Sequence, residues 1–163
     1  MNTEKGIERL FRENKEKYYR VAFSYVKNKD DALDIVHDSI VKALQKADSL
    51  SNKQYLETWF YRILINECIS FVRKNKNVMY IEELEDDRIP ATENTDSEQN
   101  MTLYEAIDKL SPKLKTVVIL RFFEDMKLEE IAQITYTKLS TVKARLYKAL
   151  KLLRIDIEDV DYD

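Results

Sequence analysis

Two amphipathic segments within residues 127–154, separated by a short polar turn, constrain the fold of this chain more than any other stretch. Apolar residues recur at helical spacing in both segments, so each predicts a helix with one face turned inward. These residues are Leu128, Ile131, Ala132 and Ile134 in the first segment and Val142, Leu146, Ala149, Leu150 and Leu153 in the second. The pattern therefore predicts a helix, a tight turn and a second helix.

The outward face of the second segment is cationic. Residues 138–154 contain six basic residues and no acidic one. Ser140 or Thr141 is the expected N-cap. The residues that point away from the apolar stripe or flank it are Ser140, Thr141, Lys143, Ala144, Arg145, Tyr147, Lys148 and Lys151. Such a helix suits the major groove of DNA, where residues near its N-terminus reach base edges and lysines neutralise phosphates. A solvated helix of an ordinary bundle is the alternative, because helix-turn-helix signatures are loose.

The expected turn, residues 136–139, has no glycine, although such turns often contain one. A non-glycine residue must therefore accept any positive φ that the turn requires.

Composition favours an all-α protein. The 163 residues include one glycine and two prolines, too few for the many turns of a sheet protein, and 35% are charged. No apolar run approaches the roughly 18 residues of a membrane span, and residues 1–14 lack the apolar centre of a signal peptide. We expect a cytoplasmic protein. The lone Cys68 fits this expectation as a core thiol.

Charge is distributed unevenly along the chain. Residues 1–74 hold 14 basic and 11 acidic residues, 75–102 hold 2 and 8, 103–154 hold 11 and 6, and 155–163 hold 0 and 5. Two basic blocks are thus separated by an acidic one. We expect two small helical domains, 1–74 and 103–154, each facing an anion, joined by a flexible acidic linker and followed by an acidic tail.

A helix is expected over residues 31–47. Its apolar face comprises Ala32, Leu33, Val36, Ile40, Ala43, Leu44 and Ala47, and its exposed face Asp31, Asp34, Ile35, Asp38, Lys42 and Gln45. Paired carboxylates can serve acid–base catalysis or hold a metal, but on one solvated face they usually form only a charged surface. His37 is the only histidine, and we expect it to be structural.

A polar loop, residues 48–54, and a helix over residues 55–74 follow. The loop could hydrogen-bond a base or a phosphate, or simply face solvent. The helix combines an aromatic cluster with Arg62, Asn66, Arg73 and Lys74. Aromatic rings beside cations suit single-stranded nucleic acid, and they also suit a helical core; composition does not decide between the two.

Together these residues resemble a bacterial sigma factor of the extracytoplasmic-function (ECF) type, in which region 2 and region 4 are joined by a linker. The block DALDIVHDSIVKAL followed by ETWFYRILINECISFVRK is similar to region 2. The block LSPKLKTVVILRFFEDMKLEEIA followed by STVKARLYKALKLLR is similar to region 4. Two blocks in this order are more specific than the helix-turn-helix alone.

The resemblance implies a promoter-recognition factor without a catalytic site, cofactor or small-molecule substrate. Its partners would be core RNA polymerase, promoter DNA and an anti-sigma factor, often membrane-anchored. The polymerase would be met by Asp31, Asp34, Ile35 and Asp38. The −10 element would be met by Ser49, Leu50, Ser51, Asn52, Lys53, Arg62, Asn66, Arg73 and Lys74. The −35 element would be met by Arg121, Ser140, Thr141, Lys143, Ala144, Tyr147 and Lys148.

The sequence departs from the usual family pattern at three positions. His37 stands where Gln is common, and Tyr136 and Ser140 stand where Gly is common. The last two bear on the geometry of the turn. Ala144 has no polar group, so it could offer only apolar contact, such as to a thymine methyl.

Other classes of protein remain open on the residues alone. A conventional transcription factor would need a receiver or ligand-binding domain, and a purely helical interaction module would leave the two basic blocks unexplained. An enzyme is the least favoured, because the sequence shows no metal cluster, nucleophile motif or Gly-rich phosphate loop.

Overall fold

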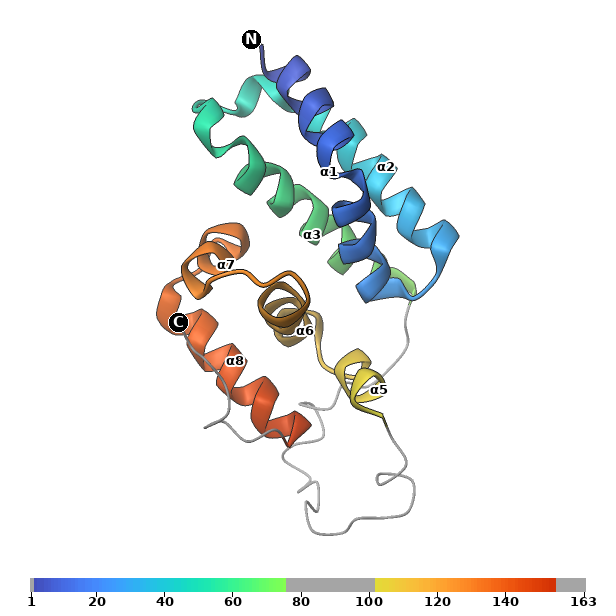
Figure 1. Ribbon diagram of the computed structural model, residues 1–163, viewed down its shortest axis with the longest axis vertical. Helices are drawn as coiled ribbons and strands as arrows, with labels where there is room; N and C mark the ends of the chain where they lie inside the picture. The colour runs from blue at the N-terminus through green and yellow to red at the C-terminus, as the bar shows by residue number, and fades with distance from the viewer. Residues whose placement is uncertain (1, 76–101, 155–163) are drawn as a thin grey trace. The chain divides into compact units, whose positions relative to one another are not determined.

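The computed structural model describes residues 2–75 and 102–154, and these are helical except for turns (Figure 1). The all-α expectation is confirmed for these residues. The expected linker, apart from its two end residues, and the acidic tail lie outside them. The chain divides into two compact units, Met1–Lys76 with Ala132–Thr137, and Asn77–Ile131 with Lys138–Asp163. Within the described residues, every helix is too short or too polar to cross a bilayer.

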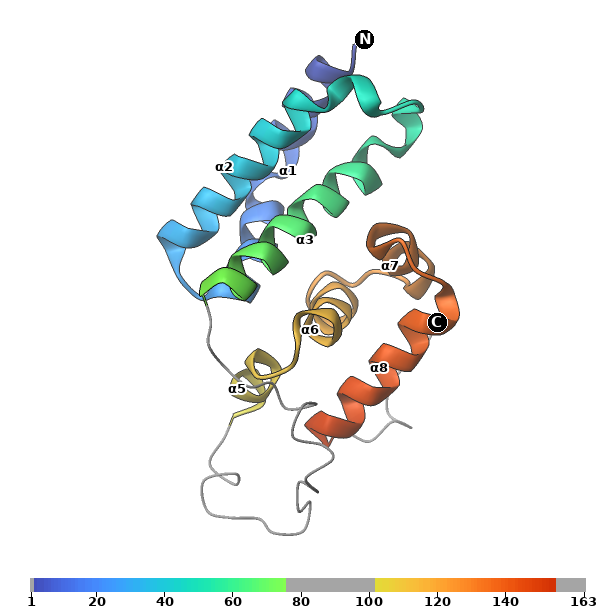
Figure 2. The ribbon, with the colours of Figure 1, turned by 180° about the vertical axis from the view of Figure 1, so that it is seen from behind.

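The first unit is a three-helix bundle of α1 (Thr3–Val26), α2 (Lys29–Gln45) and α3 (Leu56–Asn75). Each helix packs on the other two, and both views show them side by side (Figures 1 and 2). An aromatic cluster fills the bundle: the ring centroid of Tyr18 lies 4.8 Å from that of Phe60 and 5.4 Å from that of Tyr61. All three side chains are buried. These aromatics of α3 therefore form core rather than a stacking surface.

Helix α1 is a single helix with a kink at Asn14. The backbone there is non-helical (φ −128°, ψ 16°), and Asn14 Nδ2 donates to the carbonyl oxygen of Leu10 at 2.9 Å. A side chain that competes for a helix carbonyl is a recognised cause of such bends. The chain then leaves α1 through Lys27, which has φ 54°, and Asn28 caps α2 by accepting from the backbone N–H of Asp31.

Helix α2 is rotated relative to the face expected from its sequence. Ile35, predicted to be exposed, is 3% exposed, whereas Leu33, predicted to be in the core, is 48% exposed. The predicted face was wrong because Ser39 occupies the buried side: it is 0% exposed and its Oγ donates to the Ile35 carbonyl at 2.7 Å. A polar residue whose hydrogen bond is made within its own helix can lie in a core. The buried face of α2 therefore includes Ser39 and differs from the face that the apolar residues alone predict.

The second unit contains α5 (Leu103–Asp108), α6 (Pro112–Val118), a π-helical turn η4 (Ile119–Phe123), the first half of α7 (Leu128–Thr135) and α8 (Leu139–Leu153). Its central cluster joins α5, α6 and α8. The buried members are Ile107, Leu110, Leu114, Val118 and Ala149. Thr102 and Glu105 form a capping box at the start of α5, and hydrogen bonds from Thr102 hold the pKa of Glu105 below its usual value.

Tyr18→Phe tests the packing of the first core. The Tyr18 hydroxyl is buried and has no hydrogen-bond partner within residues 2–75 and 102–154. Because an unsatisfied buried donor costs about 1–3 kcal/mol, we expect Tyr18→Phe to raise the free energy of unfolding by up to about 1 kcal/mol in urea denaturation at pH 7. Tyr55→Phe, at an exposed ring, should be neutral. A loss of more than about 1 kcal/mol in Tyr18→Phe would contradict this account.

The same variant has an expected signature at alkaline pH. Burial, and secondly the carboxylate of Glu57, raises the pKa of Tyr18 above its usual value. The phenol of the unfolded chain ionises near pH 10, so the unfolded state loses its proton first and the folded state loses stability as the pH rises above about 10. Tyr18→Phe should lack this part of the alkaline loss; a decline as steep as that of the wild type above pH 10 would show that Tyr18 is not its source.

Candidate nucleic-acid interface

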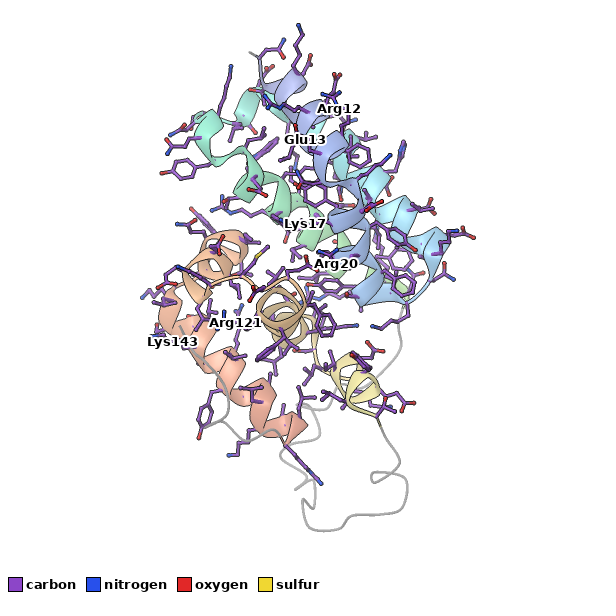
Figure 3. The ribbon with its side chains drawn as sticks, viewed as in Figure 1. Arg12, Glu13, Lys17, Arg20, Arg121 and Lys143 are labelled. Carbon is purple, nitrogen blue, oxygen red and sulfur yellow. The ribbon has the colours of Figure 1, made fainter. Side chains whose placement is uncertain are left out.

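Helix α8 presents the cationic face that the sequence predicts. Val142, Leu146, Ala149 and Leu150 are buried. The residues on the opposite side are exposed: Ser140, Lys143, Ala144, Tyr147, Lys148 and Lys151. Figure 3 shows Lys143 among the side chains of this unit. Thr141 and Arg145 are half-buried at the edges of this face.

The N-cap of α8 differs from the expectation. The cap is Lys138, whose extended backbone (φ −75°, ψ 153°) offers its carbonyl to the N–H groups of Thr141 and Val142. The prediction of Ser140 or Thr141 was wrong because the helix begins earlier, at Leu139. Both hydroxyls consequently lie in the first turn of α8, where they remain available to a ligand rather than capping the helix.

The turn before α8 closes with a Schellman motif. The N–H of Tyr136 donates to the carbonyl of Gln133 at 3.3 Å, and the N–H of Thr137 donates to that of Ala132 at 3.0 Å. Tyr136 has φ 58° and is 82% exposed. This position is the one that glycine usually occupies, so the expectation that a non-glycine residue accepts a positive φ is confirmed. Ser140, the other departure from the family pattern, lies inside α8 and has no positive φ.

A groove of about 560 Å³ runs between α6 and α8. Three cationic and three hydroxyl side chains line it: Lys113, Arg145, Lys148, Ser111, Ser140 and Thr141. Leu114 and Ala144 complete the lining, so the groove contains no carboxylate. Lys113 was missed by the sequence reasoning, although a lysine directly after the first-turn Pro112 could have suggested it.

Arg121 is placed differently from the other predicted −35 residues. It lies in the π-helical turn, is half-buried, and its Nη1 donates to the carbonyl of Met126 at 2.9 Å (Figure 3). This bond braces the connection from η4 to α7. The structure thus gives Arg121 a structural role, and its contact with DNA stays a prediction.

The predicted −10 loop is fixed by its own side chains. Two 3-10 turns, Ala47–Ser49 (η1) and Lys53–Tyr55 (η2), form its two ends. Asn52 Oδ1 accepts from the N–H of Gln54 at 2.9 Å, and Ser49 Oγ donates to the carbonyl of Lys46 at 2.7 Å. Ser49, Ser51, Asn52 and Lys53 are exposed, whereas Leu50 is half-buried. The loop is an ordered, solvent-facing edge of the first unit.

Helix α3 places its predicted residues on one side. Arg62, Asn66 and Arg73 are separated by four and seven positions, which at about 100° per residue leaves them within roughly 40° of one another. Asn66, Arg73 and Lys74 are exposed, and Arg62 is half-buried. A strand of nucleic acid could run along this line.

An apolar stripe bordered by carboxylates lies on α2. Leu33, His37 and Val41 recur every four residues and are exposed, Leu33 by 48% and Val41 by 38%. Asp34 and Asp38 are exposed beside them, and Asp31 is half-buried. The sequence predicted the exposure of Asp34 and Asp38 correctly, but it also predicted Asp31 to be exposed and assigned Leu33 to the core. An exposed apolar stripe on a charged helix is typical of a protein-binding surface.

The sequence matches two known protein families. The family model described as Sigma-70 region 2 matches residues 10–78, and the family model described as Sigma-70, region 4 matches residues 100–153. RNA polymerase sigma factor SigV of Bacillus subtilis is 47% identical over 149 residues, covering 91% of this chain and 89% of that protein. ECF RNA polymerase sigma factor SigW of the same organism is 28% identical over 160 residues, covering 90% and 86%.

Two solved structures are also similar. RpoE in complex with the anti-sigma factor NepR from Bartonella quintana has 26% identity and a TM-score of 0.63, covering 93% of this chain and 99% of that one. CnrH in complex with the cytosolic domain of CnrY has 20% identity and a TM-score of 0.65, covering 92% and 86%, and this likeness concerns the fold alone.

The strained turn before α8 yields a prediction. Since glycine adopts a positive φ without steric cost and alanine does not, Tyr136→Gly should be more stable to unfolding than Tyr136→Ala by about 1 kcal/mol. Both variants lose the tyrosine ring, so their difference isolates the backbone. Thermal or urea unfolding measures it, and equal stabilities would contradict the strain assigned to Tyr136.

Proposed function

This chain belongs to the extracytoplasmic-function sigma factors of the sigma-70 family, and from that premise we propose how its surfaces divide the work of transcription initiation. It binds core RNA polymerase, directs it to promoters and has no chemical step of its own. The single observation that carries the proposal is the 47% identity to SigV across 91% of the chain. The proposed place of action is the cytoplasm, where the polymerase transcribes.

The polymerase-binding surface that we propose is the exposed side of α2. Leu33 and Val41 supply apolar area, His37 between them supplies a polar ring, and Asp34 and Asp38 supply charge beside this stripe. Such a surface, in which exposed apolar side chains adjoin charged ones, is typical of a protein interface. Leu33 replaces Ile35 in this assignment, because Ile35 is buried.

The first unit also meets the −10 element in this proposal. The loop of Ser49, Leu50, Ser51, Asn52 and Lys53 receives an unstacked base, and the line of Arg62, Asn66 and Arg73 with Lys74 follows the backbone of the separated strand. The hydrogen bonds within the loop support this role. Contacts with a flipped base must offset the cost of unstacking it, and a loop that is already ordered loses less freedom on binding.

The second unit reads the −35 element through α8. Lys143 and Lys148 meet phosphates, while Ser140, Thr141 and Ala144 approach base edges in the major groove. Tyr147, 52% exposed on the same face, adds apolar contact. This assignment of phosphate and base contacts follows from side-chain length and charge.

Control by an anti-sigma factor completes the proposal. RpoE and CnrH were each solved in complex with a partner, the anti-sigma factor NepR and the cytosolic domain of CnrY respectively. A partner that covers the apolar stripe on α2 would compete with the polymerase for this chain. Its release would then free the chain for transcription.

Genomic run-off transcription tests the function. Purified chain with core polymerase should give transcripts from a limited set of start sites that are absent with core alone. If an active core produced no specific start in the presence of the chain, the assignment would be wrong.

Asp34→Lys tests the polymerase surface. Reversing an exposed charge beside the stripe should weaken core binding by about tenfold, because it brings a like charge against the complementary charge of the partner and slows association. Glu8→Lys makes the same change on an exposed position of α1 and should leave core binding unchanged. Fluorescence polarisation measures affinity and circular dichroism checks the fold. Equal affinities of the two variants would remove α2 from the interface.

Lys148→Ala tests the orientation of α8. Loss of one phosphate contact should weaken promoter binding by the holoenzyme and lower the slope of log affinity against log salt by about 1. The matched control is Lys109→Ala, an exposed lysine of the same unit outside the groove. An unchanged slope in Lys148→Ala would mean that this face of α8 does not meet DNA.

A further inference from the structure

We propose that the groove between α6 and α8 seats one sugar–phosphate backbone of the promoter duplex, and that Lys113 of α6 is a positioning residue there. The inference rests on the proposed function and adds to it a second helix that contacts DNA. Its occupant is the backbone, and not a base edge, because the groove combines cations and hydroxyls and has no carboxylate.

Lys113 stands out in α6 by its exposure. Every other residue of Pro112–Val118 is buried, including Lys115, which is 2% exposed. Lys113 is the single exposed residue of this helix, and its side chain lines the groove. The backbone of a helix that is otherwise buried is already held in place by packing. Less conformational freedom is therefore lost when a lysine on this helix binds a ligand.

The other groove wall supplies the matching cations. Lys148 and Arg145 project from α8 into the same groove, whose volume of about 560 Å³ exceeds that of a single phosphate. A phosphodiester between Lys113 and Lys148 would be neutralised from two helices. Ser140 and Thr141, in the first turn of α8, line one end of the groove and there adjoin the base edges that the proposed function assigns to them.

The short side chains of α8 explain why such a seat is needed. Ser140, Thr141 and Ala144 reach only a short distance from the helix, so they meet base edges only if α8 lies deep in the major groove. If only the cations of α8 contacted the DNA, the helix could still rotate about its own axis. A contact from α6, which packs on α8, fixes both its depth and its angle.

Salt-dependent binding of the reconstituted holoenzyme to a promoter mapped by run-off transcription tests the proposal. Lys113→Ala should weaken binding about three- to tenfold and lower the slope of log affinity against log salt by about 1. The loss of affinity should be the same on promoters with altered −35 bases, because a phosphate contact does not depend on base identity. Lys113→Arg should keep the slope, and Lys109→Ala should leave both affinity and slope unchanged. If Lys113→Ala behaved like Lys109→Ala, the assignment would be overturned.

Neutralising single phosphates identifies the occupant directly. A methylphosphonate placed in turn at each phosphate around the −35 element should weaken binding by the wild type at one or two positions. At those positions the same substitution should not weaken binding by Lys113→Ala any further. If the variant stayed as sensitive as the wild type at every position, Lys113 would contact no phosphate. A wild-type holoenzyme without promoter-dependent transcripts would instead refute the proposed function, so the two failures are distinguishable.

Discussion

The packing of α8 on α6 is the interaction on which the second unit depends. The buried stripe of Val142, Leu146, Ala149 and Leu150 leaves α8 only one orientation in which its apolar area is removed from water. Because that stripe and the cationic face occupy opposite sides of one helix, burial of the first dictates exposure of the second. The exposure of the cationic face is thus a consequence of the core, and no separate interaction is needed to orient it.

Much of this arrangement could be predicted from periodicity alone. The apolar positions of α7 and α8 and the exposed face of α8 recur at helical spacing in the sequence. The sequence also predicts that a non-glycine residue takes any positive φ of the turn, and Tyr136 is that residue. The failures share a cause, which is that sequence patterns ignore polar groups satisfied locally. Ser39 lies in the core because it bonds to Ile35, and α8 begins at Leu139 because the carbonyl of Lys138 initiates the helix without a side-chain cap.

The scarcity of glycine has a structural consequence at the helix ends. Lys27, Asp125, Tyr136 and Arg154 all have positive φ values between 54° and 62°. The one glycine of the chain serves packing instead: a Cβ at Gly6 would lie 3.1 Å from Leu56 Cδ2. Left-handed conformations in non-glycine residues cost free energy that the surrounding packing must offset. All four residues are exposed, and backbone hydrogen bonds to the preceding helix close the turns at Lys27, Tyr136 and Arg154.

Two lysines on one short helix show how burial separates structural from binding roles. Lys115 is 2% exposed and its Nζ lies 3.3 Å from Asp108 Oδ1, so its charge is directed toward α5 inside the unit. Lys113, two positions earlier, points into the groove beside α8. Composition and charge counts treat the two residues alike, because both add one positive charge to the same block. Only the packing of α6 distinguishes the cation that joins helices from the cation that we propose meets DNA, and the same reasoning separates buried Ile35 from exposed Leu33 on α2.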